Sequence, residues 1–374
     1  MKDLFFFLAL TLLVMSCKDK DNTQPITTNN PLATKLDSLV HQEVSDYAKK
    51  KAVAGFSIGV IQNGETHFYG YGETTEGNAK IPDENTMFEI GSITKTFTAT
   101  VALMEFGKIR PIYDFPIRLL LPTEIPTLSK NGKEIMLQHL LNHTSGLPRL
   151  PDDIDDDWDS QNPYAHYDST MMYNYLKNYQ LKREPGALFE YSNLGMGLAG
   201  VILERQLHKS YEQIIIEKVA TPLGMNRTKI TRFSQDQQNT AKPHDAKGKV
   251  VPYWDFNAYK GAGALLSTSK DMLIYAKKHL DTPTDELGQI FQQLHQITYE
   301  GKGNDGNDYK IGLGWLELTI NNQKVYVHDG GTGGFSTFIF VCPAKNLAMV
   351  FLANNADGAG APETAVRLFE ALSA

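Results

Sequence analysis

The sequence predicts an α+β protein, an α/β sandwich in which an antiparallel sheet built from both chain ends is flanked by helices. Strand patterns cluster near the two ends of the chain, whereas helical spacing fills the middle. The connections between the terminal strands are short, which favours antiparallel pairing. We therefore expect a sheet part over about residues 32–110 and 260–374, and a mostly helical inserted subdomain over about residues 111–259.

The first element along the chain is an apolar stretch, Leu4–Met15, which follows Lys2. Its twelve residues are fewer than the roughly 20 that a membrane-spanning helix needs, but they match the hydrophobic region of a secretion signal. The stretch ends in a sequence that resembles the lipobox of bacterial lipoproteins, with Cys17 as the lipidated residue. We expect residues 1–17 to be a lipoprotein signal peptide and the chain to be exported and lipid-anchored at the bacterial cell envelope, in the periplasm or at the outer membrane. An uncleaved hydrophobic tail is the alternative.

Residues 18–31 are polar, rich in Asn and Thr, and contain two prolines, which predicts a flexible tether. The chain has two cysteines, Cys17 and Cys342, so lipidation of Cys17 leaves no partner for a disulfide bond within the mature chain. Cys342 lies in an apolar run and is expected to be a small buried hydrophobe.

Beyond the tether, apolar residues recur at helical spacing from Leu32 to Tyr47, which predicts one amphipathic helix. Asn63-Gly64 separates two strand patterns and predicts a tight β-hairpin. Near the other end, three apolar runs predict three more strands, and a helix is expected from about Pro362 to the terminus.

Composition limits the class of partner. The chain of 374 residues is 41% hydrophobic, enough to bury a large core, and its formal net charge is -7. Binding to nucleic acid requires a surplus of Lys and Arg, so we expect no nucleic-acid partner. The expected partner is a small molecule or a short peptide, with membrane contact only through the lipid anchor. The sequence does not indicate an oligomeric state.

The first candidate for chemistry is Ser92-Ile93-Thr94-Lys95, which opens a helical pattern after an apolar run. A Ser in the first turn of a helix lies at the positive end of the helix dipole, and a Lys three residues later lies on the same face. A desolvated Lys would supply a neutral amine as a base. Ser267–Lys270 has the same spacing, but Thr268 and Asp271 fit a capping box, which predicts a helix start without chemistry.

Two further segments are weaker when taken singly. In Tyr191-Ser192-Asn193, the Tyr hydroxyl could relay a proton and the Asn amide could hold a substrate carbonyl, although a tight turn before a helix explains the same residues. The segment from His328 to Phe335 is rich in glycine and lies between two predicted strands. Its backbone amides could donate hydrogen bonds to an oxyanion, and a simple hairpin loop is the alternative.

The three segments occur in the order Ser-x-x-Lys, Tyr-x-Asn, His-x-Gly, which resembles the serine β-lactamase and penicillin-binding protein superfamily. The resemblance is nearest to its class C β-lactamase, DD-peptidase and esterase branch. It extends over residues 32–374, the expected β-lactamase-like catalytic domain, through further segments in the family's order: FEIGSITKTFTA, LLNHTSGLP, PLGMNRT, GAGALLSTSKDM, IGLGW and TGGFSTFIFVCPAKNLAMVFLAN.

The resemblance implies a role for each matching residue. Ser92 attacks a carbonyl and becomes acylated, and Lys95 and Tyr191 share the proton transfers. Asn193 positions the amide side of the substrate. The third motif, which includes His328, Asp329, Gly330 and Gly331, binds substrate, and the backbone N–H groups of Ser92 and Gly331 form the oxyanion hole. The resemblance implies no metal and no organic cofactor.

One position departs from the family's pattern. The third motif of β-lactamases has Thr where this chain has Asp329, and that Thr helps to bind the carboxylate of β-lactams and of D-Ala-D-Ala peptides. An ionised Asp329 repels a carboxylate, so we expect poor β-lactamase activity and consider neutral esters, amides and peptides with a free amine as substrates.

The expected function is that of a serine hydrolase that cleaves β-lactam, D-amino-acid peptide or small ester bonds, as a β-lactamase, D-Ala-D-Ala carboxypeptidase or esterase. The alternative is a lipoprotein that binds penicillin or peptidoglycan peptides without turnover.

Three other features have simpler explanations. His139 and His143 have the spacing of a zinc helix, but Leu140 stands where the motif needs Glu, so no metal site is expected. The acidic run 152–159 is expected to be a solvated loop, with Ca²⁺ binding or attraction of cationic substrates as alternatives. A cluster of tyrosines between residues 164 and 179 is expected to pack in the core, although it could line a substrate approach.

Overall fold

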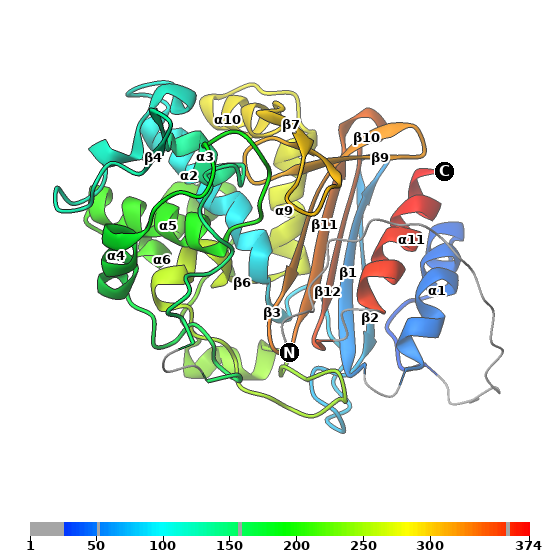
Figure 1. Ribbon diagram of the computed structural model, residues 1–374. Coiled ribbons are helices and arrows are strands. Elements are labelled where there is room, and N and C mark those ends of the chain that lie inside the picture. Colours follow the sequence, from blue (N-terminus) through cyan, green and yellow to red (C-terminus); the bar gives the residue numbers. More distant parts are fainter. Residues whose placement is uncertain (1–25, 51–52, 156–158, 357–359) are drawn as a thin grey trace.

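The computed structural model describes residues 26–374 except 51–52, 156–158 and 357–359 (Figure 1). Its centre is an eight-stranded antiparallel sheet with the strand order β2-β1-β12-β11-β10-β9-β8-β7. The predicted antiparallel sheet built from both chain ends is therefore confirmed, because the N-terminal strand β1 pairs with the C-terminal strand β12. The strands of this sheet are β1 (Gly55–Gln62), β2 (Glu65–Gly72), β7 (Tyr299–Lys302), β8 (Asp308–Ile311), β9 (Leu316–Ile320), β10 (Gln323–Gly331), β11 (Ser336–Cys342) and β12 (Leu347–Ala353).

Two pairs of short strands lie outside the main sheet. β3 (Met87–Glu89) pairs with β6 (Leu266–Thr268), and β4 (Ser129–Lys130) pairs with β5 (Lys133–Glu134).

The predicted hairpin between β1 and β2 is confirmed. Asn63 and Gly64 have φ values of 54° and 83°, the left-handed backbone that a two-residue turn between twisted antiparallel strands requires. All residues of β11 and β12 are buried, because helices cover both faces of the sheet. These strands therefore appear in the sequence as unbroken apolar runs, and Cys342 is buried among them, as expected.

Helices cover the two faces of the sheet as separate layers (Figure 1). On one face, α1 and α11 pack side by side, which brings the two ends of the domain together. The remaining helices form the other layer and the helical part beyond it. The helices are α1 (Lys35–Ala48), α2 (Thr94–Phe106), α3 (Leu137–Leu141), α4 (Ser169–Asn178), α5 (Asn193–Leu207), α6 (Tyr211–Ile215), α7 (Thr221–Leu223), α8 (Lys260–Gly263), α9 (Ser269–Leu280), α10 (Glu286–Leu294) and α11 (Ala361–Ser373).

A capping box fixes the start of α1. Thr34 caps the helix by accepting the N–H of Asp37, and the Asp37 carboxylate accepts the N–H of Thr34. Leu32, which we expected to begin the helix, has a φ of 53° and is exposed, so the helix begins three residues later than its apolar pattern.

The structure differs from the sequence prediction at the end of the expected tether. Thr28 forms a bridge with Tyr71 of β2, and the buried Asn30 amide donates to the Tyr71 hydroxyl and the Asp37 carbonyl. The polar side chains of this segment predict a flexible linker, but in the structure they form hydrogen bonds with the edge strand of the sheet. The predicted signal peptide, Cys17 and residues 18–25 lie outside the described residues. In the described part of the chain, no helix has the length and apolar character to cross a membrane.

A cluster of rings, with His279 and Trp315 buried and His295 half-buried, lies where α9, the end of α10 and the start of β9 meet. The centroid of the His279 ring lies 4.7 Å from that of His295 and 4.5 Å from that of Trp315. Both nitrogens of His279, Nε2 of His295 and Nε1 of Trp315 have no hydrogen-bond partner among the described residues. Protonation of either imidazole would therefore place a charge in an apolar site without compensation.

We expect this cluster to make the fold sensitive to acid. Burial lowers the pKa of His295 to about 3 and holds the pKa of His279 well below its usual value of 6.5. Below pH 6.5 the unfolded chain gains protons that the folded chain does not, so the free energy of unfolding falls by up to about 1.4 kcal/mol per pH unit for each histidine. Urea midpoints of the wild type and of His295→Phe, measured between about pH 7 and pH 5, test this expectation.

The Phe variant keeps a ring stacked on Tyr326, whose centroid lies 3.8 Å from that of His295. It should lose less stability on acidification than the wild type. Equal losses in the two proteins would mean that His295 does not titrate in this way.

Candidate active site

Ser92 and Lys95 lie together at the start of α2. β3 leads into a single 3₁₀ turn, η1 (Gly91–Ile93), and α2 continues from it, so Ser92 lies just before the α-helix rather than inside its first turn. Lys95 is fully buried, and its Nζ lies 2.8 Å from Ser92 Oγ and 2.6 Å from the carbonyl oxygen of Ala262. Ser92 itself is half-buried, so its hydroxyl remains accessible to a ligand.

The surroundings of Lys95 favour its neutral amine. Burial holds its pKa well below the usual 10.5, and the positive charge of Arg149 lowers it further, whereas Asp329 raises it. No carboxylate of the described residues lies within ion-pairing distance of Nζ. A neutral amine hydrogen-bonded to a hydroxyl can accept its proton, which is the arrangement that activates a Ser nucleophile.

Tyr191 completes this group from the opposite side. Its hydroxyl is hydrogen-bonded to Ser92, and its ring centroid lies 4.8 Å from Lys95 Nζ. Burial is the main cause that raises the pKa of Tyr191 above its usual 10, so the hydroxyl keeps its proton near neutral pH. The structure thus brings together the three residues that the sequence predicted as catalytic.

Asn193 begins α5, two residues after Tyr191. The Ser192 side chain caps the helix by accepting the N–H of Gly195, so the expected turn before a helix is present as well. The Asn193 amide nitrogen donates to the Tyr164 hydroxyl at 3.2 Å. Its Oδ1 is buried and has no partner among the described residues, which leaves one acceptor for a ligand N–H.

His143 supports this motif and was not predicted to do so. Its Nδ1 accepts the N–H of Ser192 at 3.1 Å, and its ring lies 4.5 Å from the Tyr191 ring. Burial holds the pKa of His143 well below 6.5, so the imidazole is neutral. His139 accepts the N–H of Met136 in the same way. Both histidines therefore act as acceptors for backbone N–H groups.

The third motif lies on β10. His328 is buried, and burial lowers its pKa to about 3, so it is neutral; its Nδ1 lies 2.6 Å from the Asp329 carbonyl oxygen. The Asp329 side chain is exposed at the opening of the site. The protein around it still limits its hydration, which raises the pKa of its carboxyl above the usual 3.8.

Two glycines bring β10 against the nucleophile. Gly91 has a φ of 50°, and a Cβ added to it would lie 2.7 Å from the backbone N of Gly331. A Cβ added to Gly330 would collide with the carbonyl oxygen of Ile90. Only glycines allow this approach, which places the Gly331 amide beside the turn that carries Ser92.

Glu89 is a buried carboxyl that no motif in the sequence singles out. Its Oε1 accepts the N–H of Trp254 at 2.9 Å, it is hydrogen-bonded to the Thr332 side chain, and Arg232 lies 3.9 Å away. Burial raises its pKa to about 7. A charged residue within the apolar run MFEIG was the signal that could have revealed it, because such a residue needs partners from elsewhere in the fold.

The remaining candidates lie outside the site. Thr268 caps α9 by accepting the N–H of Asp271, which confirms that the second Ser-x-x-Lys match is a helix start. Asp153 of the acidic run accepts a hydrogen bond from Tyr167. In the described part of the chain, no cluster of His, Cys, Asp or Glu could hold a metal ion.

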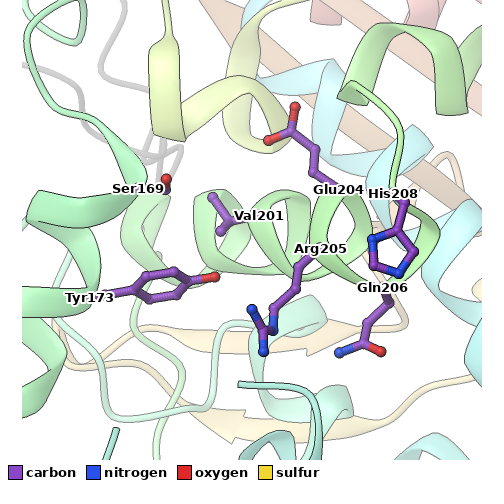
Figure 2. A pocket seen from close by; sticks show the side chains of 7 residues that line it. All are labelled: Ser169, Tyr173, Val201, Glu204, Arg205, Gln206 and His208. Atoms are coloured by element: carbon purple, nitrogen blue, oxygen red, sulfur yellow. The ribbon is translucent and has the colours of Figure 1, made fainter. Parts of the chain in front are cut away.

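A recess of about 510 Å³ lies at a distance from these residues, beside the second half of α5 (Figure 2). Asn193 is the first residue of that helix, whereas residues of its second half, from Val201 onward, line the recess. Glu204 faces it but accepts the N–H of Tyr211 and pairs with Lys260. The recess contains no activated nucleophile, so the site at Ser92 is the candidate for chemistry.

Comparisons with known proteins show the family of the chain. Residues 40–373 match the Beta-lactamase family. The chain is 27% identical to D-alanyl-D-alanine-carboxypeptidase/endopeptidase AmpH of Escherichia coli (strain K12), over 78% of this chain and 77% of that protein. It is 26% identical to a Beta-lactamase of Pseudomonas fluorescens, over 86% of this chain and 94% of that protein.

Among solved structures, the fold is similar to that of a Beta-Lactamase/D-Alanine Carboxypeptidase from Pseudomonas syringae. The TM-score is 0.76 and the identity is 22%, over 90% of this chain and 99% of that chain. Since the family match covers nearly the whole domain, the chain belongs to the Beta-lactamase family.

Proposed function

We propose that this serine hydrolase works through an acyl-enzyme on Ser92. The observation that carries the proposal is the 2.8 Å contact between Ser92 Oγ and the fully buried Lys95 Nζ, which has no carboxylate partner among the described residues. The resemblance to the β-lactamase and DD-peptidase families supports the same assignment. It also favours turnover over binding alone, because nucleophile, amine and tyrosine are all present.

The reaction proceeds in two halves. Lys95 takes the proton of Ser92 as Oγ attacks the substrate carbonyl carbon, and the N–H groups of Ser92 and Gly331 stabilise the oxyanion. When the tetrahedral intermediate collapses, the bond to the leaving group breaks, Tyr191 passes its proton to that group, and the protonated Lys95 replaces the proton of Tyr191. A water molecule then attacks the carbonyl carbon of the acyl-enzyme and gives a proton to Lys95. The bond between that carbon and Ser92 Oγ breaks, Oγ takes the proton back, and the acid is released. Asn193 holds the substrate through its unpartnered Oδ1.

Small neutral esters and amides, including D-aminoacyl amides, are the substrate class that fits the site best. His328 and Asp329 form one wall, and the exposed carboxyl of Asp329 disfavours a carboxylate at that wall. β-Lactams and D-Ala-D-Ala peptides carry such a carboxylate, so their hydrolysis is expected to be slow.

We place the protein at the cell envelope, held by a lipid on Cys17. The support is the apolar segment that precedes this cysteine. In the described part of the chain, Thr27 and Thr28 already pair with β2, so residues 18–25 separate Cys17 from the domain.

Ser92→Ala should reduce kcat/KM by more than about 10³-fold on every substrate that the wild type hydrolyses, because the acyl-enzyme cannot form. The panel is nitrocefin, a D-Ala-D-Ala peptide, a D-aminoacyl amide and p-nitrophenyl acetate. Ser269→Ala is the matched control, since Ser269 belongs to the second Ser-x-x-Lys match but bonds Ser57 in the core. Full activity of Ser92→Ala would show that the assigned nucleophile is wrong, and rapid nitrocefin hydrolysis by the wild type would contradict the role given to Asp329.

Gly91→Ala should lower kcat about 10²-fold with little change in KM, because the added methyl group displaces the Gly331 amide from the oxyanion. Gly64→Ala is the control: Gly64 also has positive φ, but a Cβ added there meets nothing within 4 Å. Both variants bear backbone strain, and only Gly91→Ala should lose activity in excess of its loss in thermal stability. Equal activities of the two variants would refute the proposed oxyanion geometry.

A further inference from the structure

Arg149 is a charged residue at the site that the proposed reaction does not use. Its backbone carbonyl accepts the N–H groups of Asn193 and Leu194 at 3.0 and 3.1 Å, which fixes it to the start of α5. Its side chain is exposed, and the guanidinium carbon lies 5.0 Å from the centroid of the Tyr191 ring. The cation therefore rests over the ring whose hydroxyl contacts Ser92.

The Arg149 guanidinium has N–H groups that are available to bind a ligand. Several surface arginines of this chain pair with carboxylates, as Arg110 does with Asp114 and Arg118 with Glu134. No carboxylate of the described residues lies within ion-pairing distance of Arg149. An Arg side chain has five N–H donors in a planar fork that matches a carboxylate, and stacking on an aromatic ring leaves the edge of that fork open.

Asp329 gives the site its second charge. It comes from β10, whereas Arg149 is bound to the start of α5, and both charges act on Tyr191: Asp329 raises the Tyr pKa and Arg149 lowers it. They do not form an ion pair with each other. The opening of the site therefore has an anionic wall at Asp329 and a cationic wall at Arg149, and both charges lie close enough to Tyr191 to shift its pKa.

We propose that Arg149 is a specificity-determining residue that binds a carboxylate in the acyl part of the substrate. This inference rests on the proposed function, in which Ser92 is acylated and Asn193 binds the acyl part. Arg149 and Asn193 belong to the same wall, because the backbone of one is hydrogen-bonded to that of the other. The repulsion by Asp329 then acts on the other wall, so an anion is accepted on one side of the scissile bond and disfavoured on the other.

The test uses three 4-nitrophenyl esters of equal chain length that differ only at the end of the acyl chain. The hexanoate is neutral, the hydrogen adipate ends in a carboxylate, and the 6-(trimethylammonio)hexanoate ends in a cation. Arg149→Gln should lower kcat/KM for the adipate about tenfold or more relative to kcat/KM for the hexanoate, chiefly by raising KM for the adipate. A change in the pKa of Lys95 would affect all three esters alike, so the ratio of the rates isolates the binding of the carboxylate. Arg149→Lys should keep part of the preference, since Lys retains the charge but not the fork.

Raising the salt concentration should weaken the preference of the wild type for the adipate, because the guanidinium is exposed. Arg110→Gln, which removes an arginine that pairs with Asp114, is the matched control and should change none of the three rates. If Arg149→Gln lowers all three rates equally, Arg149 supports the fold or the chemistry and the inference is wrong. If it changes none, the carboxylate does not bind there. Loss of hexanoate hydrolysis in Ser92→Ala tests the proposed function separately.

Discussion

The buried amine of Lys95 is the constraint on which the rest of the site depends. An ammonium ion enclosed by protein, with no carboxylate beside it among the described residues, is strongly disfavoured relative to the neutral amine. The protein provides only neutral partners, the Ser92 hydroxyl and the Ala262 carbonyl. The two nearby histidines, His143 and His328, are neutral as well. The positive charge of Arg149 further opposes protonation of the Lys95 amine. The site is therefore arranged to hold a base.

The fold delivers the other groups to this amine from separate parts of the chain. The turn before α2 supplies the nucleophile, the start of α5 supplies Tyr191 and Asn193, and β10 supplies the Gly331 amide. The closest approach is between two backbones, at Gly91 and Gly331, and Thr337 secures it by donating to the Ile90 carbonyl. A sheet built from both chain ends makes this possible, because residues far apart in sequence become neighbours across strands and turns.

The sequence was sufficient for the parts of the molecule that have local patterns. The hairpin at Asn63-Gly64, the buried C-terminal strands and the grouping of the Ser, Lys and Tyr motifs all follow from turn chemistry, apolar runs and motif order. β7 to β9 were missed because they are only four or five residues long and exposed residues interrupt each of them. Glu89, His143 and Arg149 were missed for another reason: their partners are backbone groups, rings and charges from distant segments, and no spacing in the sequence encodes those contacts.

The protonation state of Lys95 tests the central claim most directly. NMR of protein with ¹³Cε-labelled lysine, compared with Lys95→Met to assign the signal, reports the pKa of each amine. The account predicts that the Lys95 signal titrates well below 10.5, with the neutral form populated where the enzyme is active. A Lys95 signal that titrates near 10.5, together with the other lysines, would contradict it.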